Sequence, residues 1–401
     1  MTGRTRARGP ISAPAYLVLG ALTMITPLST NIYVPALPEI TAYFGSTPAS
    51  VEATVSATLI GIAVGQLVIG TISDRLGRRG PALVGTAAFV VLSILCGLAG
   101  SLPLLIVLRF LQGFAGASGV VLARASIRDR TSGKASAQAL SRLLIVAALA
   151  PVIAPLLGAI ALHVMSWQWV FGVLALMGAI AFTMAVRWFP ETLPRAARHA
   201  THAEGLRAAR GRLFRDPYFW AYVSVTGIIG VIAFSWLTSS SFMFAQEYGI
   251  GPTGYSIIVG STSLAFLVSA WINSRAVMRI GPRRALLRGL VIIALGAAAL
   301  TVAILVHAPL ALVIACALIS FGSYGGMIAN AQALAMHDHP DAAGTASAFL
   351  GAAQFVLGAL VAPTVAHFFG VTWAVGASMS LAALAALVIV AIARPPAPAL
   401  R

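Results

Sequence analysis

Residues 59–80 read LIGIAVGQLVIGTISDRLGRRG, an apolar run that passes directly into a short loop with one acid and three arginines. A second apolar run, residues 81–100, begins as soon as this loop ends. A membrane-spanning helix needs about 20 mostly apolar residues. The stretch therefore predicts two membrane spans joined by a short basic turn.

The same alternation of apolar runs and short loops continues along the whole chain of 401 residues. Six spans are predicted in the first half, at about 13–35, 51–72, 81–100, 103–125, 138–162 and 167–188. Six more are predicted in the second half, at about 218–246, 255–276, 284–306, 309–335, 343–369 and 371–393. The predicted fold class is an all-α integral membrane protein with about 12 transmembrane helices in two six-helix bundles.

The composition excludes most other classes of protein. Hydrophobic residues make up 59% of the chain and charged residues 9%, whereas a soluble domain has about 45–50% and about 25%. Too few charges remain to cover a soluble core, and so many apolar residues are incompatible with intrinsic disorder. Cys96 and Cys316 both lie in apolar runs, so no disulfide framework is indicated.

The formal net charge of +16 is distributed by topology. Arginines gather before the first span, in every second connection and after the last span, whereas the alternate connections near 36–50, 101–102, 163–166, 247–254, 307–308 and 370 hold no Lys or Arg. This positive-inside pattern predicts a multi-pass protein of the cell inner (plasma) membrane with both termini in the cytoplasm. Its partner is then the lipid bilayer and not nucleic acid, because no soluble basic domain exists to contact phosphates.

The two halves of the chain also resemble each other in sequence. The basic turn that starts at Arg75 has a counterpart that starts at Arg279, 204 residues later. The predicted domains are an N-terminal six-helix bundle (1–190), a cytoplasmic linker (191–217) and a C-terminal six-helix bundle (218–401). Residues 204–214 of the linker suit either a basic amphipathic helix on the inner leaflet or a solvated segment. Parallel six-helix repeats are one of the transporter architectures.

Residues 70–80, GTISDRLGRRG, resemble the signature loop of the major facilitator superfamily, at the expected position in a twelve-span chain. The resemblance implies a major-facilitator-type fold in which this loop locks the inner gate in one state. Asp74 is expected to pair with Arg75 or Arg79, or to lie against a helix N-terminus such as that near Gly344. The gating residues implied here are Gly70, Asp74, Arg75, Gly77, Arg78 and Arg79. Plain topogenic arginines are the alternative.

The fourth span carries an arginine inside the membrane, in residues 109–116, RFLQGFAG. Arg109 is predicted about 9 Å deep at 1.5 Å per residue, and a mid-helix charge costs about 2.5–3.5 kcal/mol. Such a residue usually serves transport. The segment resembles the helix-4 motif of drug/proton antiporters, which assigns Arg109, Gln112 and Gly113 to gating and coupling. A structural arginine bonded to backbone carbonyls is the alternative.

The fifth span holds two prolines four residues apart, in residues 150–159, APVIAPLLGA. Pro151 and Pro155 bend the helix, and the small residues around them allow close packing. The segment is similar to the exporter-associated helix-5 motif, which adds Pro151, Pro155 and Gly158 to the gating set. Segments 29–38 (STNIYVPALP), 65–67 (GQL), 167–171 (WQWVF) and 343–348 (AGTASA) narrow the resemblance to the Bcr/CflA drug-resistance branch, which includes chloramphenicol exporters.

One position departs from that branch. Asn31 stands where the branch commonly has an acid in helix 1, and none of the chain's ten acids is predicted clearly mid-membrane. A membrane-embedded carboxylate is the usual proton carrier. Because none is predicted here, the proton is expected as the coupling ion only from the resemblance to the family. Substitute carriers are Glu52, Asp74 or His367. Glu52 is otherwise expected to be a helix N-terminal charge, and His367 to lie near the outer interface.

The resemblance places the binding cavity between spans 1, 4, 7 and 10. The predicted substrate-binding residues are Thr30, Asn31, Tyr33, Trp236, Ser239, Phe242, Tyr324, Asn330 and Gln354. Aromatic walls with a few polar groups suit an uncharged or weakly polar organic molecule. Helix packing is the alternative for any one of these aromatic residues.

The sequence thus predicts a monomeric secondary transporter, not an enzyme, that exports small amphipathic compounds by alternating access in exchange for protons. Export of an endogenous metabolite (a sugar, a purine or a natural product) by the same cycle is the alternative. No cofactor and no metal are expected. Residues 337–339 (HDH) are the only dense group suited to an enzyme's metal site, and a plain loop explains them better. An ATP-driven pump is disfavoured because no phosphate-binding Gly-Lys-Ser/Thr loop occurs.

Overall fold

The computed structural model describes residues 12–131, 133–193, 211–337, 339 and 343–393. These residues form helices and contain no strand. The first half contains α1 (Ala13–Asn31), η1 (Val34–Ala36), α2 (Leu37–Phe44), α3 (Pro48–Leu76), α4 (Arg79–Gly97), α5 (Leu102–Arg130), α6 (Gly133–Val164) and α7 (Gln168–Trp188). The second half contains α10 (Pro217–Tyr248), α11 (Pro252–Ile280), α12 (Pro282–Leu305), α13 (Leu310–Ser320), η2 (Gly322–Gly326), α14 (Met327–Met336), α15 (Ala343–Phe369) and α16 (Val371–Ile392).

The helices have the length and composition of membrane spans. Within the described residues, ten helices are long and apolar enough to cross a bilayer, with the α1–α2 and α13–α14 stretches each taken as one. The helices α6 and α15 carry the shorter apolar segments Leu149–Leu162 and Thr345–Val361. Large apolar side chains such as Leu17, Val84 and Met278 point outward and are 66%, 70% and 87% exposed. Exposed apolar side chains of this size suit contact with lipid.

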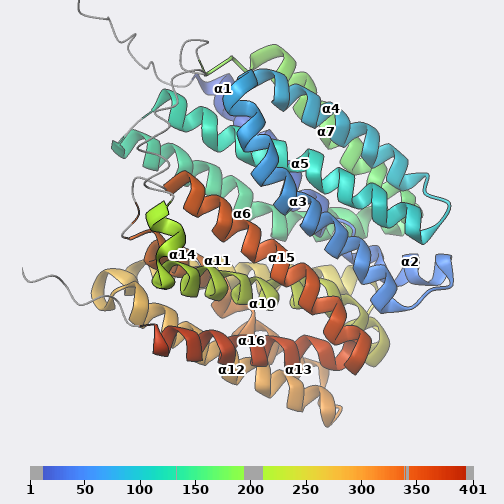
Figure 1. The fold of residues 1–401 in the computed structure, drawn as a ribbon. Helices are drawn as coiled ribbons and strands as arrows, with labels where there is room; N and C mark the ends of the chain where they lie inside the picture. The colour runs from blue at the N-terminus through green and yellow to red at the C-terminus, as the bar shows by residue number, and fades with distance from the viewer. Residues whose placement is uncertain (1–11, 132, 194–210, 338, 340–342, 394–401) are drawn as a thin grey trace, which may run out of the picture.

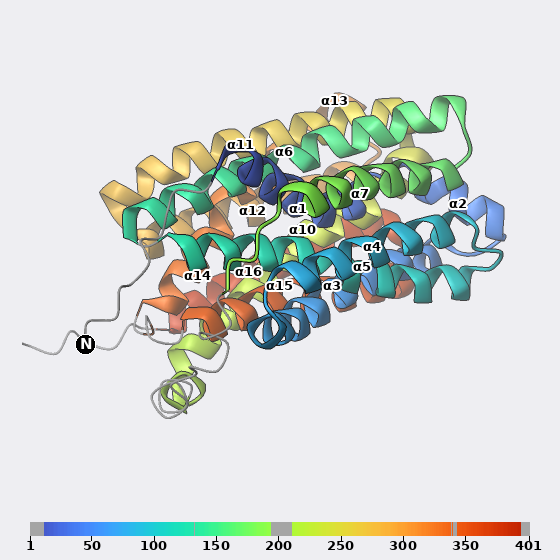
Figure 2. The same cartoon turned by 90° about the horizontal axis from the view of Figure 1, so that it is seen from above.

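The two sets of six spans lie side by side. Figure 1 shows the first set, from blue to green, above the second set, from yellow-green to red. Helix α3 packs along α15 and α6 packs along α11, and the turned view in Figure 2 shows these two pairs on opposite sides of the bundle. Most of the contact between the halves is thus made by the second and fifth spans of each set, and α10 adds contacts with α2 and α3.

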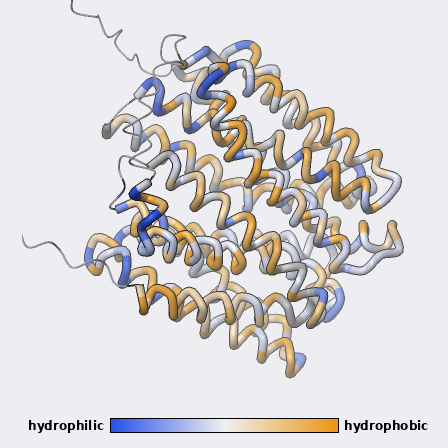
Figure 3. The backbone as a smooth tube through the Cα atoms, in the orientation of Figure 1, coloured by the Kyte–Doolittle hydropathy of each residue, from blue (hydrophilic) through white to orange (hydrophobic). Residues whose placement is uncertain are grey.

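The two ends of the bundle differ in chemistry. The described chain begins and ends on the left of Figure 1, whereas α2 lies on the right. Hydropathy coloured along the chain is mostly orange and white within the helices, and much of the strongest blue lies on the left (Figure 3). We call the end with the α3–α4 turn and the α11–α12 turn the basic end, and the end with α2 the opposite end. The positive-inside pattern predicts that the basic end faces the cytoplasm.

Glycine turns repeat between the halves at a constant spacing. Gly77 and Gly281 end the second span of each half with φ of 97° and 78°, and Gly45 and Gly249 precede that span with φ of 57° and 62°. Positive φ is favourable for glycine and rare for other residues. Both pairs are 204 residues apart, the same offset as that between the two basic turns.

A hydrogen bond repeats at the same spacing. Arg79, at the start of α4, donates Nη2 to the carbonyl of Val186 near the end of α7 at 2.8 Å. Arg283, at the start of α12, donates Nη2 to the carbonyl of Val390 near the end of α16 at 2.7 Å. Donors and acceptors are both shifted by 204 residues. Each half therefore ties its third span to its sixth with the same arginine contact.

The structure differs from the predicted spans in two places. The first span ends at Asn31, and the chain continues through η1 and the short α2 before α3 starts. The tenth span is broken by the 3-10 helix η2, whose residues Gly322–Gly326 include three glycines that weaken an α-helix. The predicted linker falls largely on residues 194–210, outside the described residues, as does most of its predicted amphipathic helix. The linker boundaries stay a prediction.

Candidate transport and gating site

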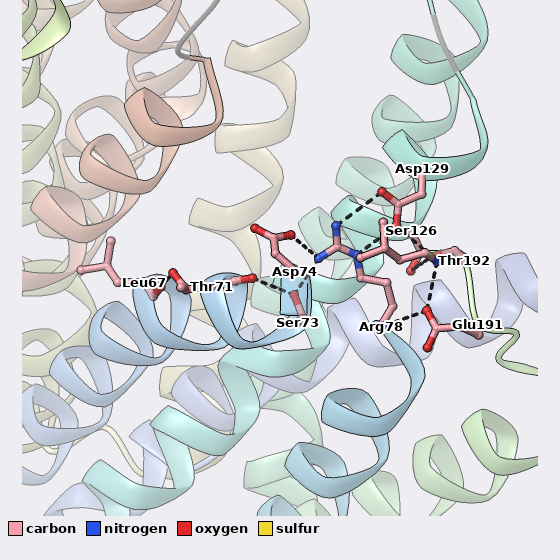
Figure 4. A network of polar contacts seen from close by, with 11 residues as sticks. Leu67, Thr71, Ser73, Asp74, Arg78, Ser126, Asp129, Glu191 and Thr192 are labelled. Carbon is pink, nitrogen blue, oxygen red and sulfur yellow. Dashed lines mark hydrogen bonds and ion pairs between the residues drawn. The ribbon is translucent and has the colours of Figure 1, made fainter. Parts of the chain in front are cut away.

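Arg78 is the centre of the polar network at the basic end (Figure 4). Its side chain is only 8% exposed. The guanidinium donates Nε to Asp129 at 2.9 Å and Nη1 to Asp74 at 2.6 Å and to Ser73 at 2.7 Å. Thr192 donates its hydroxyl to the same Asp129 carboxylate at 3.0 Å. The network ties the end of α3 to the end of α5 and to the segment after α7.

A third acid caps the helix that follows Arg78. Glu191 accepts the backbone N–H of Arg78 at 2.8 Å and that of Arg79 at 3.2 Å. Amides at a helix start lack helical acceptors and favour a negative charge. Burial alone would lower the pKa of the Arg78 guanidinium, but the hydrogen bonds and charges of Asp129 and then Asp74 raise it. Arg78 is therefore held as a permanent cation between acids of its own half.

The predicted partners of Asp74 were Arg75, Arg79 or a helix N-terminus, whereas the structure pairs it with Arg78. The reason is that Asp74 and Arg78 are four residues apart and bonded across the turn at Gly77, while Arg75 is exposed. The Asp74 side chain is itself 68% exposed. In this conformation its bond stays within the first half. A Cβ at Gly70 would meet Val121 at 3.8 Å, an ordinary contact distance, so this conformation has no need of glycine there.

Arg109 lies deep inside the first half and is 0% exposed. Its Nη2 donates to the carbonyl of Ser29 at 3.0 Å, and its Nη1 donates to Gln112 one turn along α5. The guanidinium carbon lies 4.0 Å from the ring centroid of Tyr33 and 5.5 Å from that of Phe171. The buried arginine thus joins α1, α5 and α7 through a backbone carbonyl, an amide and two rings.

The neighbours of Arg109 extend this packing into α3 and α4. Gln112 donates its amide to Ser93 of α4 at 2.7 Å. Gly113 lies so close to α3 that a Cβ there would overlap the carbonyl of Thr58. The RFLQGFAG segment therefore acts as a three-sided contact in which arginine, glutamine and glycine each face a different helix. This geometry agrees with a structural role for Arg109, and its role in transport stays a prediction.

The two prolines of α6 face the second half. Pro155 has no N–H, so the carbonyl of Pro151 four residues earlier has no helical donor. Ser263 of α11 supplies that donor at 3.2 Å, and Ser256 donates to the carbonyl of Pro155 at 2.8 Å. Gly158 comes so close to α1 that a Cβ would overlap the carbonyl of Ile32. The predicted kink motif is therefore also a contact between the halves.

The predicted substrate residues of the first half are occupied by local contacts. Asn31 is half-buried and donates its amide to the carbonyl of Pro27 at 2.7 Å and to the hydroxyl of Thr30 at 3.1 Å. Tyr33 is 0% exposed, shares a hydrogen bond of 3.0 Å with Thr54 and lies under the Arg109 guanidinium. Tyr33 and Arg109 are thus brought together in the interior of the bundle.

Aromatic rings gather around the break in the tenth span. Phe321 stacks on Trp236 of α10, with ring centroids 5.5 Å apart, and on Tyr324 of η2 at 5.7 Å with the rings 7° from parallel. Phe266 of α11 lies 5.7 Å from Tyr324. The Tyr324 hydroxyl also lies near the side-chain amide of Gln354 of α15. The structure therefore joins three predicted binding residues, Trp236, Tyr324 and Gln354, in one cluster, which we call the aromatic cluster.

The remaining predicted binding residues of the second half make no described side-chain contact with the aromatic cluster. Asn330 is buried and exchanges hydrogen bonds with Asn273 of α11 at 2.9 and 3.3 Å. Phe242 is buried within α10. Ser239 donates its hydroxyl to Glu52 of α3 at 2.7 Å. Ser239 thus contacts the other half.

Sequence reasoning misplaced Glu52 and left out two acids. Glu52 was expected at a helix N-terminus, but α3 starts earlier than predicted, because Thr47 caps it and Pro48 occupies its first position. Glu52 therefore lies one turn inside the helix and is 0% exposed. Asp129 and Glu191 are not among the predicted site residues. Their signal was weak, because their partners are 51 and 113 residues away along the chain.

Comparison with known proteins places this geometry in a family. Residues 19–363 match the Major Facilitator Superfamily. The chain belongs to that superfamily. It is 32% identical over 351 residues to an uncharacterized MFS-type transporter, YdgK, of Bacillus subtilis (strain 168), with 87% of each chain covered. It is 27% identical to the bicyclomycin resistance protein homolog of Haemophilus influenzae, with 87% of this chain and 88% of that one covered.

A solved structure shows the same fold. The xylose transporter XylE of E. coli, in a partially occluded inward-open conformation, superimposes with a TM-score of 0.72 at 14% sequence identity, covering 92% of this chain and 96% of that one. The predicted fold class and the resemblance to the Bcr/CflA type are confirmed. The transporter is a multi-pass membrane protein that binds small molecules and is not an enzyme. In the HDH group, Asp338 lies outside the described residues. Among the described residues, no group of three or more His, Cys, Asp or Glu side chains could hold a metal ion.

Proposed function

We propose that this transporter exports small, amphipathic, uncharged or weakly polar organic compounds of the chloramphenicol type, by alternating access and in exchange for protons. The observation that carries the proposal is the aromatic cluster at the broken tenth span. Interrupted membrane helices often mark the binding site of a transporter. The break at η2 lies beside three stacked rings and an amide, which suits a flat organic molecule with few polar groups.

Charge supports the same class of substrate. None of the nine predicted binding residues carries a formal charge at neutral pH. The buried cation, Arg109, is engaged with Ser29, Gln112 and Tyr33. A strongly charged substrate would need an opposite charge inside the membrane. The name of the bicyclomycin resistance relative agrees with export of a drug-like compound. We further propose that the transporter is a monomer in the inner membrane, with its basic end in the cytoplasm.

Drug resistance in a pump-deficient bacterial host tests the proposal. Expression of the wild-type chain should raise the inhibitory concentration of chloramphenicol or of a related amphipathic antibiotic at least fourfold. Trp236→Ala, which removes one ring of the aromatic cluster, should abolish most of that rise. Trp271→Ala is the matched control, because Trp271 of α11 is 59% exposed and stacks only on Arg275 in the contacts described.

Two outcomes would contradict the proposal. If the wild-type chain changed no inhibitory concentration across a broad antibiotic panel, drug export would be wrong and the metabolite alternative would take its place. If Trp236→Ala and Trp271→Ala had equal effects at equal expression, the aromatic cluster would not be the binding site. Proton exchange is measured separately, as acidification or alkalinisation of the lumen when chloramphenicol is added to proteoliposomes.

A further inference from the structure

Glu52 is a buried carboxyl group in a contact between the two halves. Its Oε1 accepts the hydroxyl of Ser239 at 2.7 Å. Its Oε2 is buried and has no hydrogen-bond partner among the described residues. The side chain lies about 6 Å along α3 from the helix start at Pro48, at 1.5 Å per residue. One serine hydroxyl is therefore the only polar group that the described structure gives to this carboxyl.

No cation among the described residues bonds to the Glu52 carboxyl group. The ionisable groups on the helices packed against α3 make no described contact with Glu52. On α5, Arg109 bonds to Ser29 and Gln112. The others, among the described residues, are Tyr16 of α1, Tyr33 between α1 and η1, Glu39 and Tyr43 of α2, Arg79 and Cys96 of α4, Arg124, Arg128, Asp129 and Arg130 of α5, Tyr218, Tyr222, Glu247 and Tyr248 of α10 and His367 of α15, none of which bonds to Glu52 in the described contacts.

An ionised carboxylate in such a place is strongly unfavourable. Burying an unpaired charge costs far more than one hydrogen bond returns, and the group takes up a proton instead. A protonated carboxyl has an O–H that can turn toward the serine oxygen or a backbone carbonyl. In water at neutral pH the same carboxyl is ionised. The contact with Ser239 therefore favours the neutral group, and separation of the halves favours the charged one.

The internal repeat shows that this position is built to join the halves. Glu52 and Ser256 are 204 residues apart, the offset of the repeat, and each lies in the first turns of the second span of its half. Ser256 is also 0% exposed and donates across the halves, to the carbonyl of Pro155. Glu52 contacts the first span of the other half and Ser256 contacts the fifth, so the two positions share the role of joining the halves but not the partner. Of the two residues, Glu52 alone can respond to protons.

We propose that Glu52 and Ser239 form a proton-operated latch on the opposite end of the transporter. A proton from the water at that end binds to the Glu52 carboxylate as the halves close, and the O–H formed is enclosed between α3 and α10. The same proton leaves the carboxyl oxygen when the halves separate and water returns. The latch deepens the proposed proton exchange and rests on the proposed alternating access. By the positive-inside prediction it faces the cell exterior.

Spin-label distances in the full chain test the latch without any substrate. Nitroxides at Ala42→Cys in α2 and Gln246→Cys near the end of α10 report the separation of the halves, since both positions are exposed and lie on elements that contact each other at the opposite end. The native Cys96 and Cys316 are buried and do not compete for label. In lipid nanodiscs, the short distance should dominate at pH 5. The ratio of the population at the long distance to the population at the short distance should rise with pH, by up to tenfold per pH unit.

Glu52→Gln keeps the shape of the protonated side chain and cannot ionise. Its distance distribution should stay short from pH 5 to pH 9. Glu39→Gln is the matched control, because Glu39 lies at the same end and accepts the backbone N–H of Trp167 within the first half; it should follow the wild type. The latch is refuted if the wild type shows no change between pH 5 and pH 9, or if Glu52→Gln changes as the wild type does.

Transport measurements separate this proposal from the proposed function. In proteoliposomes, Glu52→Gln should retain chloramphenicol binding within about twofold, but lose at least ten-fold in pH-gradient-driven chloramphenicol transport. A wild type that moves no chloramphenicol contradicts the proposed substrate and leaves the distance result to decide the latch. A wild type that transports chloramphenicol, together with a fully active Glu52→Gln, supports export and overturns the latch.

Discussion

Removal of the Arg109 side chain should destabilise the first half and stop transport. The buried guanidinium makes hydrogen bonds to Ser29 and Gln112 and lies 4.0 Å from the Tyr33 ring centroid. Hydrogen bonds between membrane helices contribute about 0.6 kcal/mol on average and at most about 1.7. A desolvated cation–π contact contributes about 2 kcal/mol. Arg109→Ala should therefore lose about 3 to 5 kcal/mol, before any cost of the space left behind.

The assay is an apparent melting temperature of the purified protein in detergent, read from tryptophan fluorescence, beside transport at equal membrane expression. Arg275→Ala is the matched control, because Arg275 also stacks on an aromatic ring, with its guanidinium carbon 3.5 Å from the Trp271 centroid, but on the surface. An exposed cation–π contact contributes about 0.5–1 kcal/mol. Arg109→Ala should melt several degrees below Arg275→Ala.

The comparison with lysine separates structure from charge. Lysine keeps the positive charge but loses the planar fork that reaches two acceptors at once. Arg109→Lys should therefore recover less than half of the stability lost in Arg109→Ala. If Arg109→Ala melted within 1 °C of the wild type, the packing argument would be wrong, and the arginine would be held for transport alone.

Two further predictions concern the basic end and the α3–α5 contact. Asp74→Asn should lower transport at least ten-fold, while the melting temperature moves by less than about 2 °C. The reason is that the Asp74 side chain of the Asp74–Arg78 pair is largely exposed, and exposed pairs contribute about 0–1 kcal/mol. Retained efflux would show that Asp74 is not part of the gate. Gly113→Ala should reduce the yield of folded protein several-fold, since its Cβ would overlap the neighbouring helix, whereas Gly80→Ala, where nothing lies within 4 Å, should express normally; equal yields by size-exclusion chromatography would contradict the close approach.

The fold was largely predictable because a bilayer requires each span to be a long apolar run, which can be read from the local sequence. Apolar run length gives the spans, and the alternation of arginine gives the connections that share one side. The break in the tenth span was not predicted, although its signal is present: residues 322–326 read GSYGG. The apolar residues on both sides made the run appear continuous. Three glycines in five residues could have indicated the interruption.

The site was less predictable, because its contacts join residues that are distant along the chain. The signature loop predicted Arg78 as a gating residue but gave no sign of its partner Asp129 in α5. Similarly, Trp236 and Tyr324 were separate predictions until Phe321 joined their rings. Glu52 was misjudged for a different reason. A shift of three residues in a predicted helix start separates an exposed N-terminal charge from a buried one.

The distribution of the described polar contacts indicates that the halves separate more easily at the basic end than at the opposite end. Three side-chain hydrogen bonds between described residues join the halves: Glu52 to Ser239, Ser256 to Pro155 and Ser263 to Pro151. The described bonds of Arg78 at the basic end, to Asp74 and Asp129, are made within one half. At about 0.6 to 1.7 kcal/mol each, three bonds amount to about 2 to 5 kcal/mol, the size of gap that separates two interconverting states. A single proton on Glu52 changes stability by up to about 1.4 kcal/mol per pH unit, so it is large enough to tip this balance.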